Sequence, residues 1–256
     1  MTTIASEQLH TLAPIGLEEL VERAALLARV DRKYVLPVAT ARQVIALAPA
    51  TTRVLEIDGR RSFGYRSTYL DTPSLDSFLT AGRGQRRRWK VRTRSYLDTG
   101  GSWLEVKTRA PRDHNLKQRI EHPDAELVGG LTAAGEEYVG SIIGAGLAAQ
   151  LRPVLATGYL RSTLLLPESD SRVTIDVDLG WTALPHGRDL DRPGLAIVET
   201  KTGSTPSAVD RLLWRLGHRP SRISKYGVGM AALHPSLPRL KWHHTLDRQL
   251  SVPRAA

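Results

Sequence analysis

Basic side chains recur at every second position in one short stretch, Arg86 to Arg109, which reads RRRWKVRTRSYLDTGGSWLEVKTR. Alternate side chains of a β-strand lie on the same face. An extended strand would therefore bring together four cationic side chains, those of Arg88, Lys90, Arg92 and Arg94. Neighbours in this row are about 6.6 Å apart, so each like-charge pair costs roughly 0.6 kcal/mol in water and about 2.5 kcal/mol at an effective dielectric near 20. Such a row is costly inside a fold unless an anion neutralises it, and arginine suits phosphate because it binds two oxygens at once.

The same stretch has the pattern of a β-hairpin. Asp98, Gly100 and Gly101 lie between its two halves, and these residue types favour a tight turn. On the second half, Glu105 and Lys107 share one face of the expected strand, whereas residues 104, 106 and 108 share the other. The hairpin therefore has one charged face and one largely apolar face.

Charged and apolar residues alternate in the same way in three further segments. The charged positions are Asp31 and Lys33, then Arg172, Asp176 and Asp178, then Glu199 and Lys201. In an ordinary β-sandwich the apolar faces would meet and the charges would point to water. If helices cover the outside instead, the sheet can close into a barrel whose lumen holds cations for phosphate and carboxylates for a hard divalent metal. The alternation itself is compatible with both arrangements.

Composition limits the classes of protein to which the chain can belong. Its 256 residues, 41% of them hydrophobic, suffice for one large β-rich domain or two small ones. Cysteine is absent, which excludes disulfides, thiol catalysis and cysteine-ligated metals. The net charge of +10 favours an anionic partner, while an aromatic content of 5% argues against a binder of single-stranded nucleic acid. No apolar run reaches the roughly 20 residues of a membrane span and no signal peptide is evident, so we expect a cytoplasmic protein.

The rest of the chain is expected to alternate short strands with helices. Strands are expected over 31–36, 54–57, 63–70, 117–121, 153–166, 171–181 and 195–201, and helices over 17–30, 40–47, 75–81, 131–151 and 204–216. The first helix would be amphipathic, with an apolar stripe of Leu17, Leu20, Val21, Ala24 and Leu27. Strands 54–57 and 63–70 flank an Asp58-Gly59 turn. Residues 1–15 and the tail from Pro235 are expected to be irregular.

Nine short motifs, in order from about residue 30 to residue 231, resemble those of the VTC domain. They read DRKYVLP, YRSTYLDTP, RRRWKVRTRSY, WLEVKTR, KQRI, RPVLATGYLRSTL, RVTIDVDLG, AIVETKTG and SKYGVGM. The VTC domain is the polyphosphate polymerase branch of the triphosphate tunnel metalloenzyme (CYTH-like) superfamily. The resemblance implies an α+β fold over residues 28–234, an antiparallel eight-stranded β-barrel tunnel with helices packed outside. Residues 1–27 would then form an N-terminal extension with the amphipathic helix, and residues 235–256 a C-terminal tail.

The resemblance also implies which side chains meet the substrate. The implied catalytic cations are Lys33, Arg92, Arg94, Lys107, Arg161 and Lys225. Further substrate-binding residues would be Lys90, Lys117, Arg119, Arg172, Lys201 and Ser224. The main metal ligand would be Glu199, with Glu105 and Asp176 as further candidates, and the metal would be Mn²⁺ or Mg²⁺. Asp31 stands where the family pattern usually has a glutamate.

The implied activity is metal-dependent transfer of the γ-phosphate of ATP to a growing polyphosphate chain inside the basic tunnel. ATP and polyphosphate would be the partners, with no nucleic acid, and any membrane partner would be a separate protein. Two alternatives stay open on the sequence. One is an inorganic tripolyphosphatase or nucleoside triphosphatase, in which water is the acceptor, and the other is a non-catalytic polyphosphate-binding module.

Overall fold

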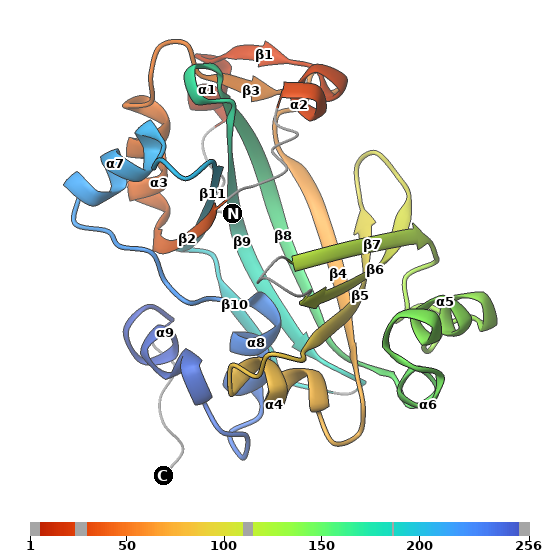
Figure 1. Cartoon of the computed structure of the whole chain (residues 1–256). Helices are drawn as coiled ribbons and strands as arrows, with labels where there is room; N and C mark the ends of the chain where they lie inside the picture. The colour runs from red at the N-terminus through yellow and green to blue at the C-terminus, as the bar shows by residue number, and fades with distance from the viewer. Residues whose placement is uncertain (1–5, 24–29, 110–114, 186, 251–256) are drawn as a thin grey trace. The chain divides into compact units, whose positions relative to one another are not determined.

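The computed structural model describes residues 6–23, 30–109, 115–185 and 187–250, which form two compact units (Figure 1). The first unit comprises Met1–Gly64, Tyr159–Leu179 and Arg192–Ile223, and the second comprises Tyr65–Gly158, Gly180–Asp191 and Ser224–Ala256. Because the chain passes between the units several times, the long strands β4 (Phe63–Asp71), β8 (Arg152–Leu166) and β9 (Ser171–Ala183) contribute residues to both.

Strands and helices occur in the mixture expected of an α+β fold. The other strands are β1 (Ala13–Ile15), β2 (Val30–Pro37), β3 (Arg53–Leu55), β5 (Trp89–Tyr96), β6 (Ser102–Arg109), β7 (Asn115–Glu121), β10 (Asp189–Arg192) and β11 (Leu195–Thr202). The helices include α1 (Ser6–His10), α2 (Leu17–Arg23), α3 (Val38–Ala46), α4 (Asp76–Gly82), α5 (Ala133–Ile143), α6 (Ala145–Ala148), α7 (Ala208–Arg215), α8 (Lys225–Leu233) and α9 (His243–Arg248). No helix within the described residues is both long and apolar enough to span a membrane.

Eight of the strands follow one another in a single path of hydrogen-bonded neighbours, β2-β11-β9-β8-β4-β5-β6-β7. The pairs β2–β11, β11–β9, β4–β5, β5–β6 and β6–β7 are antiparallel. The α+β class and the antiparallel sheet that the resemblance implies are therefore confirmed. Within the described residues the end strands β2 and β7 do not pair with each other, so the hydrogen-bonded ring of a closed barrel is not completed.

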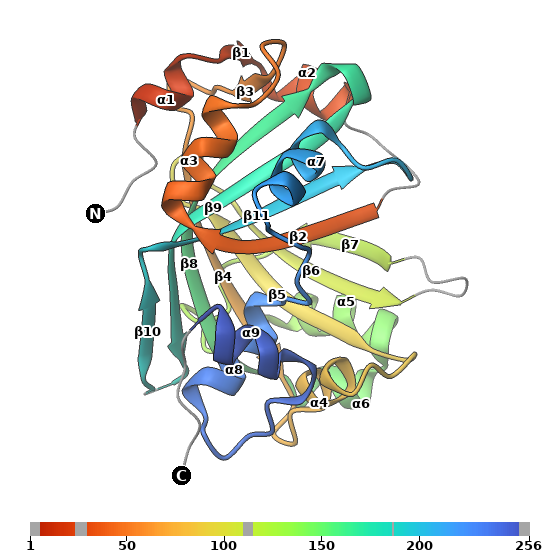
Figure 2. The same ribbon diagram turned by 90° about the vertical axis from the view of Figure 1, so that its left-hand side faces the viewer.

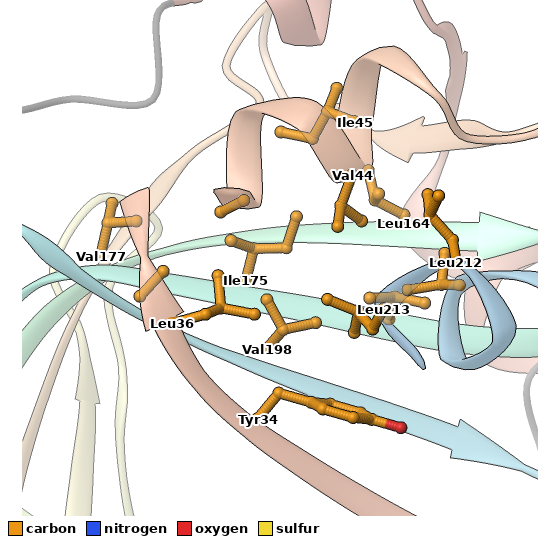
Figure 3. Close-up of a cluster of buried hydrophobic side chains, with 14 of the residues drawn as sticks. Tyr34, Leu36, Val44, Ile45, Leu164, Ile175, Val177, Val198, Leu212 and Leu213 are labelled. Carbon is orange, nitrogen blue, oxygen red and sulfur yellow. The ribbon is translucent and has the colours of Figure 1, made fainter. Parts of the chain in front are cut away.

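In the first unit, helices α3 and α7 cover one face of the sheet (Figure 2). Alternate residues of the strands supply the apolar side of this core, including Tyr34 of β2, Ile175 of β9 and Val198 of β11 (Figure 3). Val44 of α3 and Leu213 of α7 pack against them. The strand period of two leaves the intervening residues of each strand on the opposite face.

The second unit repeats this arrangement with different elements. Val91 of β5 and Leu104 and Val106 of β6 are buried in a cluster that also contains Val139 of α5. The side chain of Thr132 accepts a hydrogen bond from the Gly135 amide, so this residue caps α5. Helices therefore cover the apolar face of the hairpin, as the barrel interpretation required (Figure 1).

The N-terminal helix differs from its prediction. Its described part, α2, covers Leu17–Arg23, and Val30, expected to be the last residue of the helix, begins β2. Leu20 is buried, but Leu17 and Val21 are 51% and 55% exposed, so the expected apolar stripe is only partly covered. The stripe positions 24 and 27 lie outside the described residues.

The Asp58-Gly59 turn is present, with both residues at positive φ, but within the described residues β3 pairs with β1 and β8 and not with β4. Two expectations of irregular structure are wrong. Residues 1–15 contain α1 and β1, and the tail from Pro235 contains a 3₁₀ turn, Leu240–Trp242, and α9. Trp242 is 1% exposed, and a Cβ at Gly227 would lie 2.1 Å from its ring. The tail is ordered by this close packing, for which glycine is required.

Candidate functional site

The charged residues of each unit lie on the sheet face opposite its helix-covered core. In the first unit the Glu199 cluster comprises Asp31, Lys33, Arg161, Arg172, Asp176, Glu199 and Lys201. In the second unit the Glu105 cluster comprises Lys90, Arg92, Arg94, Glu105, Lys107, Lys117 and Arg119. Apart from Ser224 and Lys225, the expected site residues are thus brought together in two groups, one in each unit.

Strand register assembles the Glu199 cluster. Glu199 of β11 lies opposite Lys33 of β2, and Lys201 lies opposite both Asp31 of β2 and Arg172 of β9. Directly opposed side chains on one face have Cβ atoms about 5 Å apart, so these charges interact. The cluster is a consequence of local alternation in β2, β9 and β11 combined with one register.

Glu199 stays ionised because cations surround it. Burial alone would raise the pKa of its carboxyl group, but Lys33, Lys201 and Arg161 hold that pKa well below its usual range. The Lys201 ammonium forms an ion pair with Glu199 Oε1. Burial in turn lowers the pKa of Lys201, although Glu199 and Asp31 oppose the effect. Glu199 is therefore an anion within a surplus of positive charge.

Strand register also assembles the Glu105 cluster. Arg92 and Arg119 flank Glu105 on the neighbouring strands β5 and β7. Two residues further along each strand, three lysines lie in a row across β5, β6 and β7. Lys90 is opposite Lys107, and Lys107 is opposite Lys117. Like charges directly opposite each other destabilise a sheet. This row of lysines is the feature of the second unit that most favours an anionic ligand.

Glu105 is the buried counterion of this cluster. It is 0% exposed, and Arg92 donates to its Oε2 through Nε at 2.8 Å and Nη2 at 2.6 Å. Lys117 forms an ion pair with the other oxygen. Burial would raise the pKa of Glu105, but Arg92, Arg94 and Lys117 hold it below its ordinary value. The side chain of Arg92 is only 12% exposed, so the charged face is not simply a solvated surface.

Ser224 joins the second cluster through a contact that sequence spacing does not reveal. It caps α8 by accepting from the Gly227 amide at 3.3 Å, and Lys90 Nζ lies 2.9 Å from the same hydroxyl oxygen. Lys225 is the first residue of α8, and its carbonyl accepts from Trp181 Nε1 at 2.9 Å.

Tyr69, Asp71 and Tyr226 hold Arg92 and α8 in place. Tyr69 Oη lies 3.2 Å from Arg92 Nη1, and its ring stacks on Tyr226 at 5.0 Å. Tyr226 donates to buried Asp71, which also accepts from the amides of Ser77 and Phe78 at 2.9 and 3.0 Å. Asp71 thereby ties the start of α4 to α8. The Asp71-Thr72-Pro73 motif signals the end of a strand, and Tyr226 lies in the SKYGVGM motif, but neither pattern shows that the two side chains meet.

The carboxylates expected to bind a metal differ in whether their oxygens are already engaged by cations. Within the described residues, no three His, Asp or Glu side chains are grouped so that they could hold an ion by themselves. Both oxygens of Asp176 accept from Arg161, at 2.6 and 2.8 Å, and Glu105 is engaged by Arg92 and Lys117. Glu199 Oε1 pairs with Lys201, while its Oε2 accepts no hydrogen bond from the described part of the chain. Since Mg²⁺ is often bound by one or two carboxylates together with substrate phosphates, Glu199 fits a metal that shares its ligands with a phosphate.

Comparison with known proteins agrees with this architecture. The VTC domain family matches residues 28–234. A candidate adenylate cyclase from Bacillus halodurans superposes with a TM-score of 0.52 at 12% identity, covering 77% of this chain and 94% of that one. A candidate adenylyl cyclase from Hippeastrum superposes with a TM-score of 0.51 at 18% identity, covering 82% and 98%. A search of curated proteins found no significant match.

Antiparallel strands that carry a helix-covered apolar face and a lysine- and arginine-rich face define an α+β protein built to bind anions. The match over residues 28–234 spans most of the sequence, and the chain belongs to the VTC domain family.

Proposed function

We propose that this protein is a metal-dependent polyphosphate polymerase that transfers the γ-phosphate of ATP to a growing polyphosphate chain. Membership of the VTC domain family supports this proposal. In the reaction, a terminal oxygen of a phosphate or polyphosphate acceptor attacks the γ-phosphorus, the bond to the bridging oxygen breaks and ADP leaves. Phosphoryl transfer depends mainly on positioning and charge stabilisation, so no nucleophilic side chain is required.

The row of Lys90, Lys107 and Lys117 is the observation that carries the proposal. Three lysines at directly opposed strand positions repel one another, and one of them, Lys117, is paired with buried Glu105 on the same face. A chain of phosphates would bring several closely spaced negative charges to the row, whereas a ligand with a single carboxylate would bring only one.

The proposed roles follow from the contacts of each side chain. The cations named above as catalytic or substrate-binding bind phosphate oxygens, and Ser224 orients Lys90. These cations are Lys33, Lys90, Arg92, Arg94, Lys107, Lys117, Arg119, Arg161, Arg172, Lys201 and Lys225. Glu199 would hold Mn²⁺ or Mg²⁺, which supplies charge neutralisation at the phosphates when bound. Glu105 and Asp176 keep Arg92 and Arg161 oriented through their ion pairs.

A polyphosphate gel and a free-phosphate assay on one sample test the proposal. Purified protein is incubated with ATP and Mn²⁺, and a polyphosphate ladder with ADP and little free phosphate is the expected result. Free phosphate without a ladder would replace the polymerase with a hydrolase. Neither product, together with tight polyphosphate binding, would make the protein a binding module.

A triphosphatase is the second candidate. The Hippeastrum protein with the same fold is described as having a dominant triphosphatase activity. Water in place of the acceptor oxygen would use the same cations and the same metal. The two candidates therefore differ only in the acceptor, which the assay above distinguishes directly.

A further inference from the structure

Four exposed arginines lie close together in sequence on the first unit, outside the Glu199 cluster. Arg211 and Arg215 belong to α7, and Arg219 and Arg222 follow in the segment that leads to Ile223. We call these four residues the arginine patch. The sequence contains no acidic residue between Asp210 and Asp247, so this segment has no counterion of its own.

The patch differs from the other arginines of the same unit in its partners. Arg53 pairs with Glu19, and Arg61 pairs with Glu56. No member of the arginine patch forms an ion pair with any residue that the structure describes. Arg211 and Arg219 instead donate to main-chain carbonyls, those of Pro206 and Trp214. The charge of the patch is therefore uncompensated within the described chain.

Packing and one hydrogen bond place the patch next to β2. The inner side of α7 is buried through Val209 and Leu213 in the core behind β11. After α7 the chain runs back to β2, where the Ser221 amide donates to the Lys33 carbonyl oxygen at 2.7 Å. Arg222 is therefore adjacent in sequence to a residue bonded to β2 at Lys33. The Arg222 end of the patch therefore lies beside β2, whose Lys33 belongs to the Glu199 cluster on the other face of the sheet.

We propose that the arginine patch binds the part of a long polyphosphate chain that extends beyond the Glu199 cluster. The inference rests on the proposed function, because it assumes that phosphate occupies that cluster. Guanidinium groups remain charged at all working pH values and contact two phosphate oxygens at once. Exposed contacts of this kind are individually weak, so a ligand must touch several of them. A polymer with a charge on every unit meets this condition, whereas tripolyphosphate has only three phosphates to divide between the cluster and the patch.

A charge-matched pair of variants tests the proposal. The patch variant combines Arg211→Gln, Arg215→Gln, Arg219→Gln and Arg222→Gln. The control variant removes the same charge from exposed arginines elsewhere through Arg60→Gln, Arg83→Gln, Arg152→Gln and Arg188→Gln. Affinity for long-chain polyphosphate and for tripolyphosphate is measured on each protein. Thermal unfolding confirms that both variants are folded.

The patch variant is expected to bind long-chain polyphosphate about tenfold more weakly than the wild type, because four exposed ion pairs each contribute a fraction of a kcal/mol. Tripolyphosphate affinity should change much less, and the control variant should resemble the wild type with both probes. An equal loss in both variants would mean that only net charge matters and would overturn the proposal. So would an equal loss of affinity for both probes in the patch variant. A variant with Arg→Lys at all four patch positions should bind long-chain polyphosphate with an affinity between those of the wild type and the patch variant, because it keeps the charge and loses the two-pronged contact.

Two further measurements distinguish this inference from binding of other anionic ligands and from the proposed function. Duplex DNA and anionic phospholipid vesicles serve as competing probes, and a patch-dependent loss larger for either than for polyphosphate would overturn the assignment of the ligand. Binding needs no turnover, so the length dependence can be measured even if ATP is not a phosphate donor. A wild type that binds tripolyphosphate but gains nothing from chain length refutes only the patch. A wild type that binds neither polyphosphate refutes both.

Discussion

Arg161 of β8 and Asp176 of β9 form a two-pronged ion pair in which Nε and Nη2 donate to the two carboxylate oxygens at 2.6 and 2.8 Å. The side chain of Asp176 is 2% exposed and that of Arg161 is 14% exposed. Asp176 and the nearby Glu199 raise the pKa of Arg161 well above its usual value, although burial opposes them. Arg161 is thus a fixed cation, and Asp176 is committed to orienting it.

Replacing Asp176 by Asn should therefore disturb Arg161 rather than a metal. We expect Asp176→Asn to lower the free energy of unfolding by about 3 kcal/mol, because a buried cation loses its partner. Phosphate affinity should also fall, while the Mn²⁺ affinity measured with a bound nucleotide should stay the same. Asp178→Asn on the same strand is the control and should change stability by less than about 0.5 kcal/mol. A selective loss of Mn²⁺ affinity would return Asp176 to the role of a metal ligand.

Glu199→Gln should abolish most metal-dependent turnover while the protein remains folded. A bound divalent cation contributes several kcal/mol of charge stabilisation, so we expect a rate loss of about 100-fold or more. The Mn²⁺ concentration needed for half-maximal turnover should also rise. Exposed Glu168, which accepts from Thr51, provides the matched control as Glu168→Gln. Unchanged turnover in Glu199→Gln would remove Glu199 from the metal site.

The two arginines of β5 should respond differently to truncation. Arg92 is bonded to Glu105 and Tyr69, so Arg92→Ala should weaken nucleotide binding and destabilise the protein by about 3 kcal/mol. Among the described residues, Arg94 makes a long contact of 3.5 Å to Ser67 and lies over the Tyr65 ring. Arg94→Ala should therefore weaken binding with a stability change below about 1 kcal/mol, and relief of repulsion favours a gain. Calorimetric binding and thermal unfolding check both, and lower stability of Arg94→Ala with unchanged binding would make Arg94 a structural residue.

The buried Glu105 carboxylate gives a prediction for pH. Its pKa lies below the ordinary value of 4.5 in the folded protein, so its contribution to stability is complete above that value and is lost as the pH falls toward the folded pKa. Glu105→Gln should cost about 3 kcal/mol near neutral pH, because Arg92 and Lys117 lose their buried partner. The difference between wild type and variant should shrink between about pH 5 and pH 3 as the unfolded wild type takes up the proton. Urea unfolding at several pH values in this range measures the difference in the free energy of unfolding. For the exposed control Glu121→Gln, that difference should not change with pH.

Local alternation explains how much of the candidate site the sequence could predict. Glu105, Lys107, Glu199 and Lys201 share faces because a strand has a period of two, and that period needs no knowledge of the partner strand. The helices that cover the opposite faces are also visible in the sequence as separate periodic segments. The expected strands from 31–36 to 195–201 are accordingly present, with small shifts of their ends.

The remaining parts depend on contacts between distant segments. Tyr226 reaches Asp71 across 155 positions, and Tyr34 donates to buried Asp210 across 176 positions at 2.7 Å. The pairing of β3 with β8 likewise follows from the tertiary fold, because a Gly-containing turn at residue 59 is equally compatible with a hairpin. In the tail, Trp242 is buried only because Gly227 leaves room for its ring.

The alternation of buried and charged residues in β11 also restricts insertions and deletions in the codons for this strand. Val198 and Thr200 lie among the buried residues, and Glu199 and Lys201 lie between them on the charged face. Inserting or deleting a single codon here would move every later side chain of the strand to the other face. Charged side chains such as Glu199 and Lys201 would then point into the core under α3 and α7, and residues of the buried face would take their places on the charged face. Changes of length should therefore accumulate in the turns, whereas in β11 evolution can proceed only by substitution.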